Sequence, residues 1–174
     1  MSKKRGWMIA AALQVLFLLF IAGSYYSIDY IGKEIKIKTE PIDPTDILYG
    51  DYVTLNFDIS TVPISEWHGK EDLSNRGQSH VYVLLEKNKD GYYGVSGVYP
   101  NKPEASGNQV ILNARADRVW IGNGSADQLQ LTYGFERYYV QENTGKNLEE
   151  KASDMDVTIG VAPWGASKIL SLTP

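Results

Sequence analysis

Apolar and polar residues alternate strictly in a segment that follows a Gly-Asp pair about a third of the way along the chain. Its apolar positions share one face and its polar positions the other: Val53, Leu55, Phe57 and Ile59 against Tyr52, Thr54, Asn56, Asp58 and Ser60. A period of two residues is typical of a half-buried β-strand. We therefore predict a strand over residues 50–60, with Leu55 and Phe57 packed in the core.

Similar alternating segments recur along the rest of the chain. They lie at residues 34–38, 80–87, 92–99, 110–114, 118–121, 128–133, 135–140, 157–161 and 168–172. Turn-forming residues separate many of them, such as the Asp90-Gly91 pair that favours a hairpin, and residues 64–79 show no period and are expected to form a long loop. One short helix is expected at residues 147–152. The pattern predicts a mainly β fold, a single antiparallel β-sandwich or barrel-like domain.

The N-terminal part of the chain is a continuous apolar segment. Residues 7–28 contain no charge, and as a helix they would span roughly 33 Å, about the thickness of a hydrocarbon core. Lys3, Lys4 and Arg5 precede the segment, and no acidic residue occurs before Asp29. Because basic flanks stay in the cytoplasm, we predict a single-pass transmembrane helix in the cell membrane with a cytoplasmic N-terminus and an extracytoplasmic C-terminal domain.

This interpretation divides the chain into four parts. They are a basic cytoplasmic tail (1–6), a transmembrane helix (7–28), an extended connector that holds the first strand (29–46) and a β-rich domain (47–174). A cleaved signal peptide is the alternative, because Ala22-Gly23-Ser24 is a small-residue cleavage pattern. Tyr25 and Tyr26 lie beyond that cut and resemble membrane-interface anchors, which favours the uncleaved helix.

One polar residue interrupts the apolar segment. An amide in lipid is costly unless another helix receives it, and Ala10 lies one turn before Gln14 and leaves room for a close approach. We therefore expect a polytopic membrane protein as a possible partner through the Gln14 helix. The alternative is a glutamine tolerated in a lone span.

Composition excludes several classes of function. The chain has no cysteine, so it forms no disulfide, no thiolate zinc site and no cysteine nucleophile. From Asp29 onward it carries 14 of its 17 basic residues and all 21 acidic residues. An acidic domain is the opposite of a nucleic-acid binder. His68 with Glu66, Glu71 and Asp72 matches no strong metal-binding spacing, so we predict no nucleic acid, no metal and no cofactor.

Two segments resemble those of a known family. Gly50, Asp51, Tyr52 and Leu55 match the motif that names the GDYXXLXY family of bacterial proteins, Phe57 stands in place of its final tyrosine, and Asp43-Pro44 resembles its lead-in. Residues 133–142, YGFERYYVQE, resemble a downstream segment of the same family. The resemblance implies a membrane-attached domain of uncharacterised function, whose relatives are often found near, or fused to, polytopic membrane proteins. It implies no reaction and no catalytic residues.

The candidate ligand- or partner-binding residues come from these two segments. Tyr52 lies on the polar face of its predicted strand, and Asp51 is expected to accept backbone hydrogen bonds in the preceding turn. Glu136 and Arg137 are adjacent in a strand and point to opposite faces unless Gly134 introduces a bulge.

Arg137 has two possible roles. It could pair with Asp51 or Asp58 inside the fold, or clamp an anionic ligand. Tyr138 belongs to a set of tyrosines that could form an aromatic surface for a sugar polymer or a protein.

Three functions remain open at this point. The first is a non-catalytic accessory or interaction domain that acts with an integral membrane partner. The second is an extracytoplasmic ligand-binding module, for a glycan or another ligand, that uses Tyr52, Arg137 and the 64–79 loop. The third, ranked last, is a hydrolase that uses Asp51 and Glu136, because none of the common catalytic motifs occurs.

Overall fold

The computed structural model describes residues 3–40, 52–70, 78–119, 128–139 and 155–173. Along these ranges the chain forms one long helix, eleven strands and a short 3-10 helix. In chain order the elements are α1 (Lys3–Ile31), β1 (Lys33–Glu40), β2 (Tyr52–Thr54), β3 (Asn56–Phe57), β4 (Thr61–Pro63), η2 (Ile64–Glu66), β5 (Ser79–Lys87), β6 (Tyr93–Tyr99), β7 (Gln109–Val119), β8 (Gln128–Thr132), β9 (Arg137–Tyr139), β10 (Asp156–Val161) and β11 (Ser167–Thr173).

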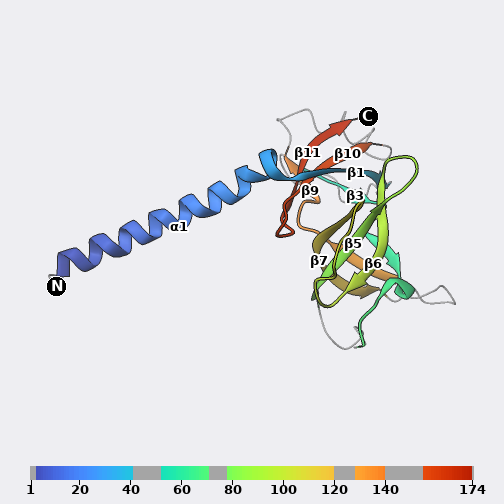
Figure 1. Cartoon of the computed structure of the whole chain (residues 1–174), viewed down its shortest axis with the longest axis horizontal. Helices are drawn as coiled ribbons and strands as arrows, with labels where there is room; N and C mark the ends of the chain where they lie inside the picture. The colour runs from blue at the N-terminus through green and yellow to red at the C-terminus, as the bar shows by residue number, and fades with distance from the viewer. Residues whose placement is uncertain (1–2, 41–51, 71–77, 120–127, 140–154, 174) are drawn as a thin grey trace.

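The strands form two antiparallel sheets and a two-stranded ribbon. One sheet has the strand order β11-β10-β1-β3, the other has the order β4-β8-β7-β5-β6, and β2 pairs with β9 in the ribbon. α1 projects from one end of this β-rich body (Figure 1). The predicted mainly β, barrel-like fold behind one N-terminal apolar helix is therefore confirmed.

One hydrophobic core joins the two sheets. Ile35 and Ile37 of β1 and Ile159 of β10 are fully buried against Val83, Leu112 and Leu131 of the five-stranded sheet. Each comes from an alternating segment, so every second side chain points inward. Leu55, Phe57 and Ile59 are also buried, as the sequence predicts.

The prediction of one continuous strand over residues 50–60 is wrong, although the prediction of which residues face the core is correct. β2 pairs with β9, whereas β3 pairs with β1 through Thr39 opposite Phe57. The chain therefore changes partner near Leu55, which belongs to neither strand. A turn follows at once: the Ser60 N–H donates to the Phe57 carbonyl at 2.9 Å.

Two further predictions are corrected by the strand pairing. Residues 110–114 and 118–121 were expected as separate strands, but β7 is continuous through Ala116, which is 1% exposed. The inward-facing residues at this point are alanines. Because alanine is small and only weakly apolar, the alternating pattern is hard to recognise there in the sequence. The 64–79 loop also begins with regular structure, because η2 leads into Trp67, which bridges Val98. The helix predicted at 147–152 lies outside the described residues.

A bulge interrupts β6 between Gly94 and Gly97. The pairing of β5 with β6 shifts between Leu84 and Leu85, so that Ser96 has no opposite residue. The Ser96 hydroxyl instead donates to the Leu84 carbonyl at 3.2 Å. The two hairpins β5–β6 and β10–β11 are confirmed with bounds within two residues of the prediction.

α1 is longer than predicted, and its last turn packs on the β10–β11 hairpin. Ile28 is 2% exposed, and it fits because residue 160 is glycine: a Cβ there would lie 2.9 Å from Ile28 Cγ2. Lys168 Nζ lies 2.7 Å from Asp29 Oδ1 and 4.5 Å from the ring centroid of Tyr25. Apolar packing, an ion pair and a cation–π contact together join the helix to the body.

Replacing Phe57 by alanine tests whether this motif residue serves the core. Phe57 is fully buried, so Phe57→Ala should lower the free energy of unfolding by about 3–5 kcal/mol. Denaturant titration of the full chain in detergent measures the change. The control is Thr54→Ala at an exposed site of the same segment, which should change stability by less than about 0.5 kcal/mol. Equal stability of both variants would contradict a core role.

Candidate functional site

The two segments singled out in the sequence are direct neighbours in space. In the β2–β9 ribbon Tyr52 lies opposite Tyr139, Val53 opposite Tyr138 and Thr54 opposite Arg137. The pairing extends by one more hydrogen bond, in which the Leu55 N–H donates to the Glu136 carbonyl at 2.7 Å. Segments that lie about eighty residues apart in the sequence therefore act as one structural unit.

A line of aromatic rings continues this unit into the core. The ring centroids of Phe57 and Phe135 lie 5.3 Å apart, and those of Phe135 and Tyr133 lie 5.5 Å apart. The Tyr133 hydroxyl donates to the Ile59 carbonyl at 2.7 Å. The turn between β8 and β9 is thus attached to the segment around β3 by packing and by a hydrogen bond.

Glu136 closes that turn. Its carboxylate accepts a hydrogen bond from the Gly134 N–H at 2.8 Å and a second from the Tyr133 N–H. Gly134 has φ +93°, a conformation that favours glycine. The chain bends at Gly134, so Glu136 lies in the turn and not in a strand. The arrangement gives the Glu136 side chain a structural role within the turn.

Two ionisable groups beside this turn are strongly perturbed. Desolvation, and then the charge of Glu40, raise the pKa of Asp58 from 3.8 to about 6, although part of the residue reaches solvent. Burial raises the pKa of Tyr133 well above its usual value, with smaller contributions from the charges of Glu136 and Asp58. Tyr133 therefore stays a neutral hydroxyl donor at physiological pH.

The other predicted site residues are placed as follows. Asp43, Pro44, Gly50 and Asp51 lie outside the described residues, and Tyr52 is described by its backbone in β2. Arg137 is exposed at the start of β9, and Tyr138 is partly buried against the core. The ligand- or partner-binding roles of Asp51, Tyr52, Glu136, Arg137 and Tyr138 stay predictions.

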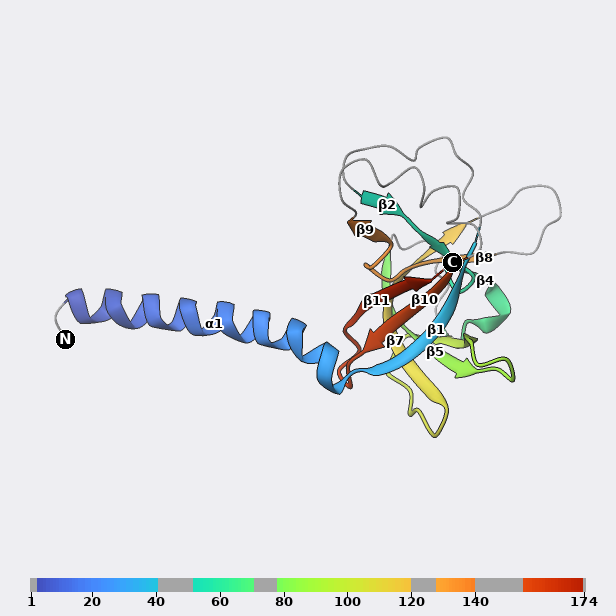
Figure 2. The ribbon, with the colours of Figure 1, turned by 90° about the horizontal axis from the view of Figure 1, so that it is seen from above.

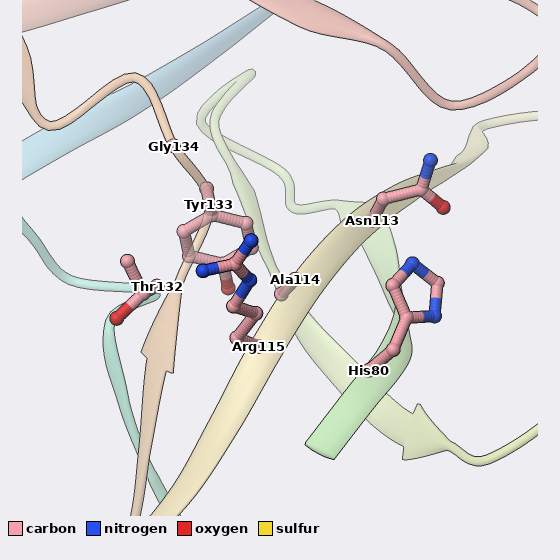
Figure 3. A pocket seen from close by; sticks show the side chains of 7 residues that line it. All are labelled: His80, Asn113, Ala114, Arg115, Thr132, Tyr133 and Gly134. Atoms are coloured by element: carbon pink, nitrogen blue, oxygen red, sulfur yellow. The ribbon is translucent and has the colours of Figure 1, made fainter. Parts of the chain in front are cut away.

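A recess of about 270 Å³ opens beside the β8–β9 turn. Its walls come from β5, β7, β8 and the turn itself, and its lining residues are His80, Asn113, Ala114, Arg115, Thr132, Tyr133 and Gly134 (Figure 3). The pairing of the strands brings them together, because His80 lies opposite Arg115, which also lies opposite Thr132. Side chains from three adjacent strands therefore meet on one face of the sheet.

The chemistry of this recess suits a group that accepts hydrogen bonds. A guanidinium, an imidazole, an amide and a hydroxyl line it, and none of the described residues in its lining is acidic. Such a set can bind a carboxylate, a phosphate or a sugar oxygen. Nothing in the sequence singles out Asn113, Arg115 and Thr132, because they are ordinary outward-facing strand residues that only the strand register brings together.

His68, the histidine of the weak metal-binding pattern in the sequence, packs against an aromatic ring. The His68 ring stacks on the Tyr99 ring at 4.7 Å between centroids, and Glu71 and Asp72 lie outside the described residues. Within the described ranges there is no group of three or more His, Asp and Glu side chains placed to hold a metal ion.

Comparison with known proteins gives one match. A family model described as "GDYXXLXY protein" matches residues 14–172. The match includes both segments of the β2–β9 ribbon, the recess and most of α1. No curated protein and no solved structure matches the chain.

Removing the Glu136 carboxylate tests its role in the turn. Glu136→Ala leaves two backbone N–H groups without their acceptor and should lower the free energy of unfolding by about 1–2 kcal/mol, while Glu136→Gln, which keeps one oxygen, should cost about half as much. Denaturant titration measures both, with Glu104→Ala at an exposed site as control. Unchanged stability with lost binding of a partner would instead assign Glu136 to recognition.

Asp58 predicts a pH dependence of stability. The folded chain binds the Asp58 proton more tightly than the unfolded chain, so ionisation of Asp58 lowers stability as the pH rises from about 4 to about 6. Near pH 7, Asp58→Asn should therefore raise the free energy of unfolding by on the order of 1 kcal/mol after solvent screening, and the gain should vanish near pH 4. Thermal melts across this range measure the difference, with exposed Asp90→Asn as control. A gain that persists at pH 4 would contradict the assignment.

Proposed function

Since the chain belongs to the GDYXXLXY family, we propose that it is a membrane-anchored, extracytoplasmic accessory domain that acts with an integral membrane partner. α1 anchors the protein, and the β-rich body carries the interaction surface on the far side of the membrane. In this proposal the domain itself catalyses no reaction.

The observation that carries the proposal is the surface of α1. The helix Lys4–Ile31 is long enough for a membrane span, and its most apolar 18-residue window has a mean hydropathy of 2.1, although a signal sequence has the same properties. Its apolar side chains project on all sides, with Leu16, Phe17 and Leu19 each 62% exposed. A helix that is apolar all round needs lipid or other helices around it. Lys3, Lys4 and Arg5 at the N-terminal end of α1 favour a cytoplasmic N-terminus.

The contact between α1 and the body supports an uncleaved helix. Ile28 and Asp29 belong to the last turn of α1, and they pack on Gly160 and pair with Lys168. Cleavage near Ala22-Gly23-Ser24 would leave a short helical stub with few residues to hold its conformation. A continuous helix keeps the same contacts and sets the direction in which the body leaves the membrane.

Gln14 supports a helical partner. It lies in the middle of α1, exposed, and Ala10 one turn earlier is exposed as well. A glutamine amide in lipid gains from a hydrogen bond to a neighbouring helix, and a small residue lets that helix approach. A polytopic membrane protein supplies both the helix and the bond.

A second candidate function rests on the recess beside the β8–β9 turn. In this alternative the body is a ligand-binding module for a glycan or another ligand rich in hydrogen-bond acceptors. Arg115 and His80 would bind the ligand in the recess. Tyr52, Arg137 and the 64–79 loop would extend the surface. A hydrolase based on Asp51 and Glu136 ranks below both, because the Glu136 carboxylate already accepts two backbone hydrogen bonds.

Extraction in gentle detergent tests the first function. The tagged full chain should co-purify in stoichiometric amount with one polytopic membrane protein, and Gln14→Leu should reduce the recovery of that partner about 3- to 10-fold while the chain stays in the membrane fraction. Quantitative mass spectrometry measures the ratio, with Val15→Leu on the same helix as control.

Three outcomes separate the alternatives. A mature chain that starts near Tyr25 and leaves the membrane at high pH would contradict the anchor. A monomer that retains a glycan, lost in Arg115→Gln, would favour the ligand-binding module. Protease treatment of intact cells that leaves the body uncut would contradict its extracytoplasmic location.

A further inference from the structure

A second opening lies directly at the end of α1. It has a volume of about 400 Å³, within the roughly 300–1,000 Å³ of typical ligand sites. Its lining is mostly apolar and comes from the end of α1, the β6–β7 loop, the start of β7 and the end of β10: Ile31, Lys33, Lys102, Pro103, Ala105, Val110, Ile111, Val161, Ala162 and Pro163. We call it the helix-end groove. The β10–β11 hairpin and the loop before β7 lie close to this end of the helix (Figure 2).

The position of the groove along α1 places it at the membrane surface. At 1.5 Å per residue, about 20 residues cross a hydrocarbon core of about 30 Å. Counted from Trp7, the core ends near Ser27. Ile31 then lies about 6 Å further out, within a headgroup layer that is about 5–8 Å thick. The apolar lining of the groove therefore adjoins lipid headgroups and the upper parts of their chains.

Two cations border this apolar lining. Lys33 Nζ lies 3.2 Å from the carbonyl oxygens of Gly107 and Gln109, and Lys102 Nζ lies 3.2 Å from that of Pro163. Within the described ranges neither lysine has a carboxylate partner, whereas Lys168 beside the same helix end is paired with Asp29. Carbonyl contacts hold the two lysines at the groove without neutralising their charge.

This charge is unusual for the body. From Asp29 onward the chain has 14 basic and 21 acidic residues, so a random surface site would be acidic. The two lysines, which have no acidic partner among the described residues, complement the phosphate of an anionic lipid at this end of the body. An apolar groove next to them complements the chain of the same molecule.

We propose that the helix-end groove binds one anionic glycerophospholipid of the adjoining leaflet. Part of an acyl chain lies along Ile31, Val110 and Val161, and the phosphate lies between Lys33 and Lys102. The bound lipid fills the gap between the end of α1 and the β6–β7 loop and steadies the body on the membrane. The inference rests on the proposed anchoring by α1, because only an embedded helix holds the groove at this depth.

Other occupants fit the groove less well. A zwitterionic lipid has the chains but no net charge for two lysines without acidic partners. A segment of a protein partner would have to reach a site that lies in the headgroup layer beside the anchor. In the proposed anchoring, lipids of the adjoining leaflet lie directly beside the groove, so a lipid needs no long approach to reach it.

The test uses the full chain reconstituted in nanodiscs and released into native mass spectrometry. Discs contain equimolar phosphatidylglycerol and phosphatidylcholine. The wild-type chain should retain one phosphatidylglycerol in preference to phosphatidylcholine. The double variant Lys33→Gln/Lys102→Gln should lower this preference about 10- to 30-fold, since each lysine near an anionic surface contributes about fivefold. Lys33→Arg/Lys102→Arg should keep it.

Two further variants separate binding from folding. Ala105→Trp fills the groove from an exposed loop position and should abolish retention with both lysines in place. Lys70→Gln/Lys89→Gln removes the same charge from exposed sites outside the groove and should change nothing. Unaltered melting temperatures would show that each variant is folded.

The outcomes are distinct for the two proposals. Incorporation into discs with equal retention of both lipids, or with retention unaffected by the lysine and tryptophan variants, overturns the lipid site and leaves the anchor standing. Failure of the chain to enter discs overturns both. Crosslinks from Ala105 to a protein and not to lipid, in native membranes, would replace the lipid by a protein occupant.

Discussion

The body depends on the way Glu136 joins two distant parts of the chain. Its carbonyl accepts the Leu55 N–H, and its carboxylate closes the turn at Gly134. One residue therefore fixes both where β2 meets β9 and where β8 ends. The ring stack of Phe57, Phe135 and Tyr133 lies beside the same joint. The two segments that resemble those of the family are the two halves of this joint.

The local parts of the fold follow from the sequence, and the reason is physical. Hairpins such as β5–β6 and β10–β11 are set by alternation on either side of a tight turn, so both signals lie within a short window. Burial is equally local, because a strict period of two decides which face turns inward. Leu55 and Phe57 were assigned to the core on that basis alone, and both are buried.

Long-range pairing could not be predicted in the same way. The change of partner from β9 to β1 near Leu55 depends on a register between segments far apart in the chain, and one sequence contains no signal for it. The recess beside the turn has the same origin, since Arg115 and His80 meet only because β5 and β7 pair in that register. The contact of Ile28 with Gly160 was equally hidden, because a glycine that makes room for a helix looks like any other strand glycine.

The firm seating of α1 on the β10–β11 hairpin also limits the movement of the body. Lys168 contacts both Asp29 and Tyr25, and β1 begins two residues after α1 ends, so no flexible spacer separates α1 from the first strand. These contacts set the orientation of the body relative to α1. In the proposed anchoring, the body would meet other molecules at a fixed height above the bilayer, which favours neighbours embedded in the same membrane over freely diffusing ones.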